Sequence, residues 1–181
     1  MKTRSEVYTM LSLVCFSTLL LTHHAVFASE QERIEQARSA ALPSISADAT
    51  IVDNGEVIVE GNNGWTCMPD TLPGDNAPIC VDDVWMQMMQ ALGNKDDFTA
   101  ETIGISYMLR GDIGAGVSNS NPFHHDHKNA DDYVETGPHL MIIVPREVLV
   151  GITDDPSEGG PYVMWGDTPY AHIMVPLGDP K

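Results

Sequence analysis

The sequence predicts a single α+β domain with a mainly antiparallel sheet and one or two packed helices. Strand-like and helix-like segments do not alternate regularly along the chain, which argues against a parallel, doubly wound sheet. Two pairs of strand-like segments are joined by short, turn-rich connections, which is typical of antiparallel hairpins. A chain of 181 residues is long enough for one domain with a sizeable core. An all-β sandwich with a peripheral helix is the alternative.

Local patterns place the elements along the chain. Ser29 and Glu32 form a capping box that starts a helix, which Pro43 ends. The Asn54-Gly55 pair favours a type I′ hairpin turn, because both central residues of that turn need a positive φ. The predicted elements are a helix over 29–41, strands over 49–52 and 56–60, a loop over 61–79, a helix over 84–92 capped by Asp82 or Asp83 and ended by Gly93, a strand over 102–110 with Ile103, Ile105, Tyr107 and Leu109 on one face, a long polar loop over 111–137, a strand over 138–145, a helical turn over 146–150, and a hairpin of strands 161–165 and 170–177.

Residues 1–28 have the three-part pattern of a secretory signal peptide. Two basic side chains precede a mostly apolar run over 7–21, and small residues at 26 and 28 fit a cleavage site. The apolar run is shorter than the roughly 20 residues that a bilayer span needs, so a permanent membrane anchor is the less favoured interpretation. We therefore expect residues 29–181 to be exported to the periplasm or the medium as one domain without a stable membrane anchor.

The charge of the chain excludes one class of partner. Its 26 acidic and 9 basic side chains give a formal net charge of −17. Such a chain is repelled by nucleic-acid phosphates and anionic lipid headgroups, so we expect no nucleic-acid binding. Hydrophobic residues make up 43% of the chain, as in an ordinary folded domain. The acidic residues are therefore interpreted as solvating the surface of an exported globular protein.

Two cysteines, Cys67 and Cys80, remain once the signal peptide has been removed. In an oxidising compartment such a pair is expected to form a disulfide, which would stabilise the fold by roughly 3 kcal/mol. The residues between them include three prolines and a glycine, which predicts a loop. A redox-active pair normally has Cys-x-x-Cys spacing, and a metal site needs reduced thiols, so both alternatives fit less well.

Two short segments, 139–145 and 172–176, resemble each other and read as strands. The period of two along a strand puts His139 and Met141 on one face, and His172 and Met174 on the corresponding face of the second segment. Neighbouring strands would then form a patch of imidazoles and thioethers, ligands that suit copper and particularly Cu(I). Alternatively, the methionines fill gaps in the core and the imidazoles bond to backbone near strand ends. Antiparallel pairing would also place the two histidines at opposite ends.

A second candidate metal site is the run His124, His125, Asp126 and His127 in the long polar loop. Imidazoles and carboxylates are ligands of zinc and copper, so this run could chelate an ion from a flexible segment. Adjacent histidines cannot all face one centre, however, and zinc enzymes hold their ligands on rigid elements. The alternative is a solvated polar segment with adventitious affinity.

No catalytic residue can be nominated from the sequence. It contains no His-Glu-x-x-His zinc motif, no Gly-x-Ser-x-Gly elbow and no phosphate-binding glycine loop. The favoured expectation is an exported protein that binds a ligand or a transition metal, copper or zinc, and is not an enzyme. The rival hypotheses are a hydrolase-type enzyme whose histidine and carboxylate groups converge in the fold, and a protein-interaction domain that uses exposed indoles of Trp65, Trp85 and Trp165.

Several motifs together resemble a group of small exported bacterial proteins of unassigned function. The resemblance spans about residues 49–177 and rests on the segments Gly-Trp-Thr-Cys-Met-Pro, Val-Trp-Met, Gly-Pro-His, Gly-Pro-Tyr-Val-Met-Trp and Thr-Pro-Tyr. It implies export but no activity, cofactor or site residue. The His-His-Asp-His run departs from the pattern of that group, which puts a shared metal site in this loop in doubt.

Overall fold

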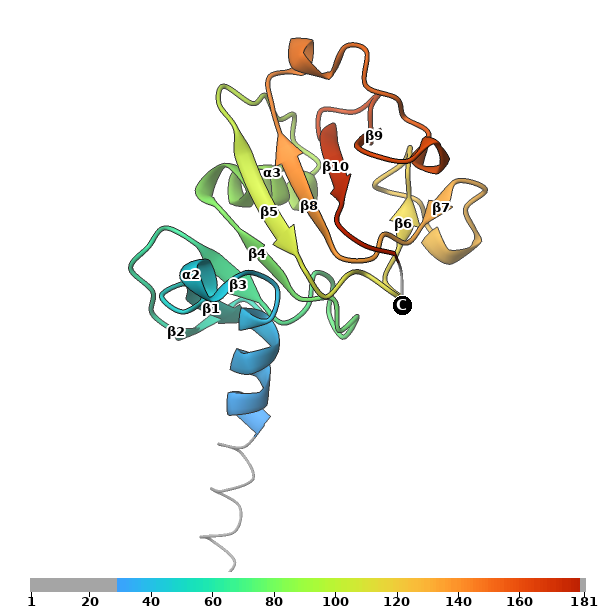
Figure 1. The fold of residues 1–181 in the computed structure, drawn as a ribbon. Helices are drawn as coiled ribbons and strands as arrows, with labels where there is room; N and C mark the ends of the chain where they lie inside the picture. The colour runs from blue at the N-terminus through green and yellow to red at the C-terminus, as the bar shows by residue number, and fades with distance from the viewer. Residues whose placement is uncertain (1–28, 180–181) are drawn as a thin grey trace, which may run out of the picture. The chain divides into compact units, whose positions relative to one another are not determined.

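A computed structural model of the protein describes residues 29–179 (Figure 1). The signal-peptide prediction for residues 1–28 lies outside the described residues. The described residues up to 35 belong to one compact unit and those from 36 onward to another, and the fold below is that of the second. Within the part of the chain that the structure describes, no helix is long and apolar enough to cross a membrane.

The fold is built on an open, eight-stranded sheet. Its strands are β1 (Thr50–Asp53), β2 (Glu56–Val59), β3 (Thr66–Met68), β4 (Ile79–Val81), β5 (Gly104–Met108), β8 (His139–Ile143), β9 (Tyr162–Met164) and β10 (His172–Pro176), in the spatial order β2-β1-β3-β4-β5-β8-β10-β9. Neighbouring strands pair antiparallel except β1 and β3, which are parallel. The predicted α+β class with a mainly antiparallel sheet is therefore confirmed, and the sandwich alternative is not what forms.

The β1–β2 hairpin forms as the sequence predicts. Asn54 and Gly55 have φ values of 50° and 81°, the positive values that a type I′ turn requires. The second predicted hairpin is also present, because β9 and β10 pair antiparallel. Between them, the predicted helical turn after β8 is a short 3₁₀ helix, Arg146–Leu149.

Pro43 does more than end the first helix. The helix covers residues 29–38, three fewer than predicted, and Pro43 then begins a further short helix, α2 (Pro43–Ser46). Proline suits the first position of a helix because its missing N–H would have no partner there and its φ is already helical. The sequence predicted only that Pro43 ends the first helix, so α2 was not predicted.

Cys67 and Cys80 are disulfide-bonded, but they do not bracket a simple loop. They lie directly opposite each other on β3 and β4, with their Cα atoms 4.0 Å apart. The predicted loop over 61–79 was therefore too long, because its prolines are confined to the connection between these strands and the strands themselves were missed. The disulfide joins the β2-β1-β3 part of the sheet to the remainder.

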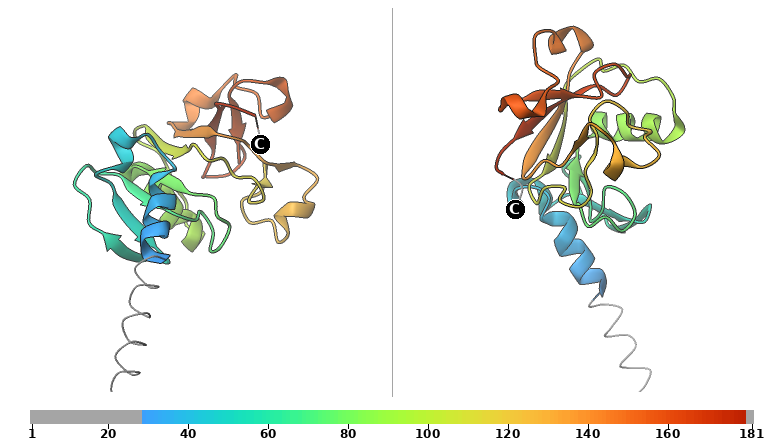
Figure 2. Two further views of the ribbon diagram at one scale, coloured as in Figure 1. Left: turned by 60° about the horizontal axis from the view of Figure 1, so that its bottom comes forward. Right: turned by 90° about the vertical axis from the view of Figure 1, so that its right-hand side faces the viewer.

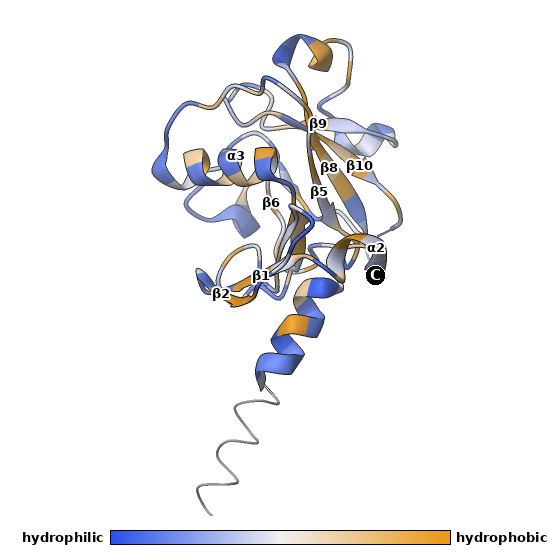
Figure 3. Ribbon diagram, turned by 90° about the vertical axis from the view of Figure 1, so that its left-hand side faces the viewer, coloured by the Kyte–Doolittle hydropathy of each residue, from blue (hydrophilic) through white to orange (hydrophobic). Residues whose placement is uncertain are grey.

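The helix α3 (Asp83–Asn94) covers one face of the sheet. Asp82 caps it by accepting a hydrogen bond from the Trp85 backbone N–H at 2.9 Å. The prediction that Gly93 ends the helix is wrong, because Gly93 lies within the last turn and Lys95 adopts the left-handed conformation instead, with φ of 62°. In Figure 3 α3 combines hydrophobic and hydrophilic residues, and its buried members are Trp85 and Met88.

The polar stretch 111–137, called here the polar lobe, is more ordered than a loop. It contains the two-stranded sheet of β6 (Val117–Ser118) and β7 (Tyr133–Val134) and a 3₁₀ turn, His127–Asn129. Figure 2 shows the polar lobe and α3 on the same side of the main sheet. Three of its side chains, Ala115, Val117 and Val134, pack against the core cluster. The prediction that residues 111–137 form one long loop is therefore corrected.

The buried face of β5, β8 and β10 is not their aliphatic face. Along β5 the buried residues are Gly104, Ser106 and Met108, whereas Ile105 and Tyr107 are only half-buried and Ile103, just before the strand, is exposed. The same alternation buries His139, Met141 and Ile143 of β8 and His172 and Met174 of β10, and it leaves Leu140, Ile142, Ile173 and Val175 half-buried. The face that could carry metal ligands is thus the inner face, beneath α3 and the polar lobe.

Candidate functional site

His172 begins strand β10 and lies on the inner face of the sheet. Only 1% of its surface is exposed. Met164 of β9 lies directly opposite in the strand register, and Met174 follows two residues later on the same face. The imidazole is therefore flanked by thioether side chains on its own strand and on the next.

The hydrogen bonds of His172 determine its tautomer. Its Nδ1 lies 2.9 Å from the backbone oxygen of Tyr170, which can only accept, so Nδ1 carries the proton. Burial lowers the pKa of His172 to about 4, so the ring is neutral at physiological pH. The Nε2 atom consequently presents a lone pair, and among the described residues this buried atom has no hydrogen-bond partner. This is the tautomer in which an imidazole binds a metal ion.

Two indole rings enclose the imidazole. The ring centroids of Trp85 and Trp165 both lie 5.1 Å from that of His172, at interplanar angles of 78° and 85°. Trp85 comes from α3 and Trp165 from the turn after β9. The imidazole is thus held edge-to-face between two aromatic walls and shielded from water.

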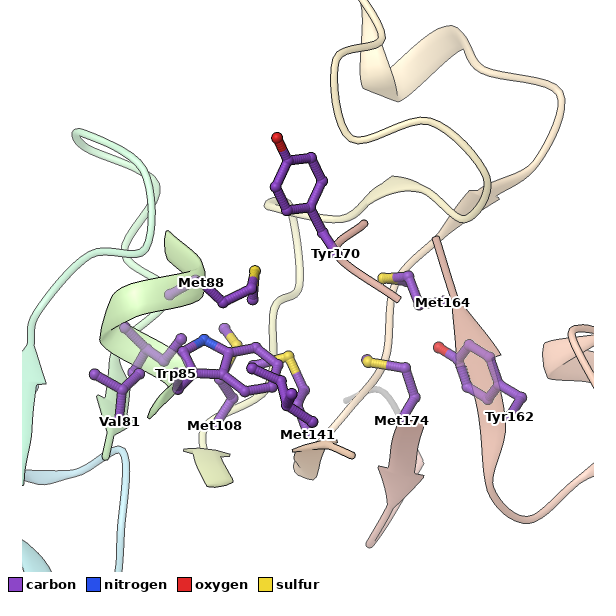
Figure 4. Packing of buried hydrophobic residues seen from close by; sticks show 12 residues of the cluster. Val81, Trp85, Met88, Met108, Met141, Tyr162, Met164, Tyr170 and Met174 are labelled. Carbon is purple, nitrogen blue, oxygen red and sulfur yellow. The ribbon is translucent and has the colours of Figure 1, made fainter. Parts of the chain in front are cut away.

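Methionines supply much of the surrounding core. Figure 4 shows Met164 and Met174 with their sulfur atoms turned to the same interior side, and Met88 and Met141 in the same cluster. The buried methionines of this cluster are Met88, Met108, Met141, Met164 and Met174. The predicted patch of thioethers therefore exists on one face. Thioether sulfurs are soft, polarizable atoms that fill cores and also bind soft metal ions.

His139 occupies the other end of the same inner face. In the antiparallel register it pairs with Pro176, four residues from His172, which corresponds to about 13 Å along the strands. Its Nδ1 lies 2.7 Å from the Gly137 oxygen, and burial lowers its pKa below the usual range. The structure thus places His139 and His172 on one face but at opposite ends, which favours separate environments over one shared ion.

The loop histidines lie close together, unlike His139 and His172. The ring centroid of His124 lies 5.0 Å from that of His125 and 5.9 Å from that of His127. However, Nδ1 of His124 accepts from the Asp126 N–H, and Nδ1 of His127 accepts from the Ser118 N–H, at 3.2 and 3.1 Å. In a neutral ring the proton must then reside on Nε2, which leaves no lone pair for an ion. Over residues 29–179, no group of three or more histidine, cysteine or acidic residues is placed to hold a metal ion.

A buried polar network at the neck of the polar lobe was missed by the sequence reading. The Thr136 N–H donates to the Asp112 carboxylate at 2.7 Å, and the Thr136 hydroxyl lies 2.8 Å from that of Tyr162. Burial raises the pKa of Asp112 to about 7, and the negative charge of Glu135 adds to the rise. In the sequence, Asp112 follows Gly111 and Thr136 precedes Gly137, at the two ends of the polar lobe. Polar residues beside glycines resemble ordinary turn residues, so the sequence does not reveal that these two are bonded.

Two hollows of the surface lie away from the imidazoles. One of about 280 Å³ is lined by the β1–β2 turn and residues 68–73, and one of about 120 Å³ includes Phe98, Arg146 and Ala171. Neither includes His139 or His172, so these hollows lend the hydrolase hypothesis no support.

The indoles are not exposed as an interaction domain would require. Trp85 is buried, and Trp65 and Trp165 are half-buried. The Trp65 ring packs edge-on against Tyr107, and the Trp165 indole N–H donates to a backbone oxygen of the polar lobe.

Comparison with known proteins adds no family assignment to this picture. No family model matches the chain, and neither a curated protein nor a solved structure shows significant similarity to it. The resemblance to small exported proteins stays a prediction, and the case for a function rests on the geometry around His172.

Proposed function

We propose that this protein is an exported copper-binding protein that holds Cu(I) through Nε2 of His172 and the thioether sulfurs of Met164 and Met174. The observation that carries the proposal is the buried Nε2 lone pair, which has no hydrogen-bond partner among the described residues. A buried acceptor without a partner typically costs about 1–3 kcal/mol, so such a group calls for an explanation. A metal ion that binds this lone pair provides one.

The chemistry of the neighbours favours Cu(I) over zinc. Thioether and imidazole are ligands for Cu(I), whereas zinc sites are built from thiolates, imidazoles and carboxylates. The side chains adjacent to His172 in the strand pattern are methionines, and both cysteines of the domain are in the disulfide. The Nδ1–H to carbonyl bond is also the outer contact that usually orients a metal-binding histidine.

The two indoles would further stabilise a bound cation. An ion on Nε2 would lie near the rings of Trp85 and Trp165, which flank the imidazole. The faces of indole rings attract cations, most strongly where water is excluded. Export to an oxidising compartment is part of the proposal, and the disulfide is compatible with it.

Competition for Cu(I) against a chromophoric chelator, under anaerobic conditions, tests the proposal. The mature chain, purified without a histidine tag, is expected to take one equivalent of Cu(I). The His172→Leu variant should lose this binding, because it removes the only nitrogen ligand proposed. Met164→Leu and Met174→Leu should each weaken the affinity, by at least about tenfold.

The matched control is His139→Leu, which removes an equally buried imidazole at the other end of the inner face. It should retain one equivalent of Cu(I) with the affinity of the parent protein. Circular dichroism of each variant shows whether it is folded. Binding of less than a tenth of an equivalent by the parent protein, or equal binding by a folded His172→Leu variant, would contradict the proposal.

The alternative predicted from the sequence, a surface site for zinc or Cu(II) at His124, His125 and His127, would need these side chains to rearrange, because no such group among the described residues is placed to hold an ion. Only the proximity of the rings supports it: the centroid of His124 lies 5.0 Å from that of His125 and 5.9 Å from that of His127. An ion there would first have to displace the backbone N–H donors from Nδ1 of His124 and His127. The same titration with zinc in place of Cu(I) tests it, because binding that survives His172→Leu and is lost in a His125→Ala variant would assign the ion to the loop.

A further inference from the structure

We propose that Trp165 and the polar lobe bonded to it form a gate over His172, which must open before anything reaches Nε2. The purpose of the gate rests on the proposed copper site. Its geometry stands on independent contacts of Trp165, so the gate can be tested without a metal.

Trp165 has a strained backbone. Its φ is 55°, in the left-handed region, where bulky residues are rarely found. Such a conformation persists only where the surroundings hold it in place, and strained residues concentrate at functional sites. Its side chain is one of the two aromatic walls of His172, with the ring centroids 5.1 Å apart.

The polar lobe supplies the contacts that hold Trp165. Its backbone N–H donates to the Asn119 oxygen at 2.7 Å, and its indole N–H donates to the Ser118 oxygen at 3.0 Å. These are the two hydrogen-bond donors that a tryptophan has. Both therefore end at one point of the polar lobe, at the end of β6.

Other side chains also attach the polar lobe to the domain: Ala115, Val117 and Val134 pack against the core cluster, and the Asn119 side chain donates to the Asp154 oxygen at 2.9 Å. Near its tip, Phe123 packs edge-on against Tyr170 with ring centroids 5.8 Å apart, and the Lys95 ammonium lies 5.2 Å from the Phe123 ring. At its neck, Gly111 has a φ of 74° and lies so close to Gly137 that a Cβ at position 111 would be 3.0 Å from the Gly137 carbonyl carbon. The two ends of the polar lobe thus meet at two tightly packed glycines.

Opening follows from these contacts. If the polar lobe moves about its neck, Trp165 loses both of its donor contacts, and its backbone keeps only the bonds that its oxygen accepts from the N–H and hydroxyl of Thr168, at 2.9 and 2.8 Å. The indole would then leave the imidazole, and Nε2 of His172 would become accessible. A buried ligand site needs such an opening, because an ion cannot cross a closely packed core.

Acylation of histidine by diethyl pyrocarbonate, followed by peptide mass spectrometry, measures this opening without a metal. In the parent protein we expect slow modification of both buried imidazoles. Trp165→Phe keeps an aromatic ring over His172 but removes the bond to Ser118, and should speed modification of His172 by about fivefold, the effect of one lost hydrogen bond on the open population. The matched control, Trp65→Phe, changes an indole that packs on Tyr107 and should leave the rate unchanged.

In Trp165→Phe, His172 could react faster simply because the smaller phenylalanine ring leaves space beside it. A second variant distinguishes this effect from opening of the gate. Phe123→Ala leaves Trp165 intact and removes an exposed side chain that anchors the tip of the polar lobe. The gate predicts faster modification of His172 in this variant too, with His139 unchanged. Unchanged His172 rates in both variants, a change in Trp165→Phe alone, or equal acceleration at His139 would each overturn the gate.

The same experiment distinguishes the gate from the copper proposal. Bound Cu(I) should protect His172 from acylation, and Phe123→Ala should release Cu(I) to a chelator faster than the parent protein does. If the parent protein binds no Cu(I), the proposed function fails, while the acylation rates still decide whether Trp165 and the polar lobe gate His172.

Discussion

At the scale of single residues, hydrogen-bond direction separates histidines that look alike in the sequence. His172 and His139 each have Nδ1 beside a carbonyl oxygen and so keep a lone pair on Nε2. His124 and His127 receive backbone N–H bonds at Nδ1, which places their protons on Nε2. The sequence identified the histidines as candidates, but it could not reveal this difference, because the donors and acceptors come from backbone groups placed by the fold.

Asp112 makes the stability of the protein depend on pH. Its pKa rises from 3.8 to about 7 on folding because burial disfavours the charged carboxylate. A raised pKa means that its stabilising contribution is complete below pH 3.8 and is lost as the pH rises through about 7. Asp112→Asn removes this loss while keeping an acceptor for the Thr136 N–H. We expect this variant to be more stable than the parent protein by roughly 4 kcal/mol at pH 8, and nearly equal to it at pH 4.

Urea unfolding of both proteins from pH 4 to pH 8 measures this difference. The two proteins must be compared because the histidines also make stability depend on pH. Burial lowers the pKa of His139 and His172, so their contribution to the free energy of unfolding is lost as the pH falls below their ordinary pKa. Their effect is common to both proteins and cancels. A difference in unfolding free energy that does not change with pH would show that Asp112 does not titrate in this range.

At the scale of elements, the turn and capping signals were more informative than the apolar patterns. Asn54-Gly55 located the first hairpin, and Asp82 located the start of α3. Short strands such as β3, β6 and β7 were missed, because two or three residues are too few to show the alternation of a strand. The aliphatic positions of β5, β8 and β10 look like a core face, yet α3 and the polar lobe cover the opposite face. Which face is covered depends on tertiary packing and cannot be read from alternation alone.

The close packing of α3 on β5 depends on Gly104. A Cβ at that position would lie 2.9 Å from Cγ1 of Val84 and 3.2 Å from the Trp85 backbone nitrogen. Gly104→Ala should therefore push α3 away from the sheet and lower the free energy of unfolding by about 1–3 kcal/mol, the usual effect of overpacking. Thermal unfolding measures this loss.

Gly93→Ala is the matched control for that substitution. Gly93 lies in the last turn of α3, and a Cβ there would meet nothing within 4 Å. Alanine has a higher helix propensity than glycine, so this variant should be more stable than the parent protein by about 0.5–1 kcal/mol. Equal effects of the two substitutions would contradict the assignment of Gly104 to the contact between helix and sheet.

At the scale of the whole molecule, the sequence predicted the class of the fold but not the location of its most unusual feature. Composition and hairpin signals were sufficient for a mainly antiparallel α+β domain, and the cysteine pair was sufficient for the disulfide. The patch of histidine and methionine was also predicted, and it forms on one face. Its two imidazoles are separated because β8 and β10 run antiparallel. What the sequence could not show is that two indoles from distant segments enclose His172.

The inner face around His172 differs in polarity from the chain as a whole. The net charge of −17 comes from many acidic residues, whereas the inner face around His172 is apolar and built from thioether and aromatic side chains. A dry, soft environment on the inside of an acidic protein is consistent with a ligand that prefers sulfur to carboxylate oxygen. The proposed copper site has sulfur and nitrogen ligands, so a measurement that identifies the ligand atoms tests it best.

X-ray absorption at the copper edge, on the mature protein loaded with one equivalent of Cu(I) under anaerobic conditions, provides that measurement. The account predicts sulfur scatterers together with one nitrogen, and loss of the sulfur signal in a Met164→Leu, Met174→Leu double variant. Because both cysteines of residues 29–179 are disulfide-bonded, sulfur from this part of the chain must come from methionine. A spectrum of nitrogen and oxygen ligands alone would contradict the account and would direct attention to the histidines of the polar lobe.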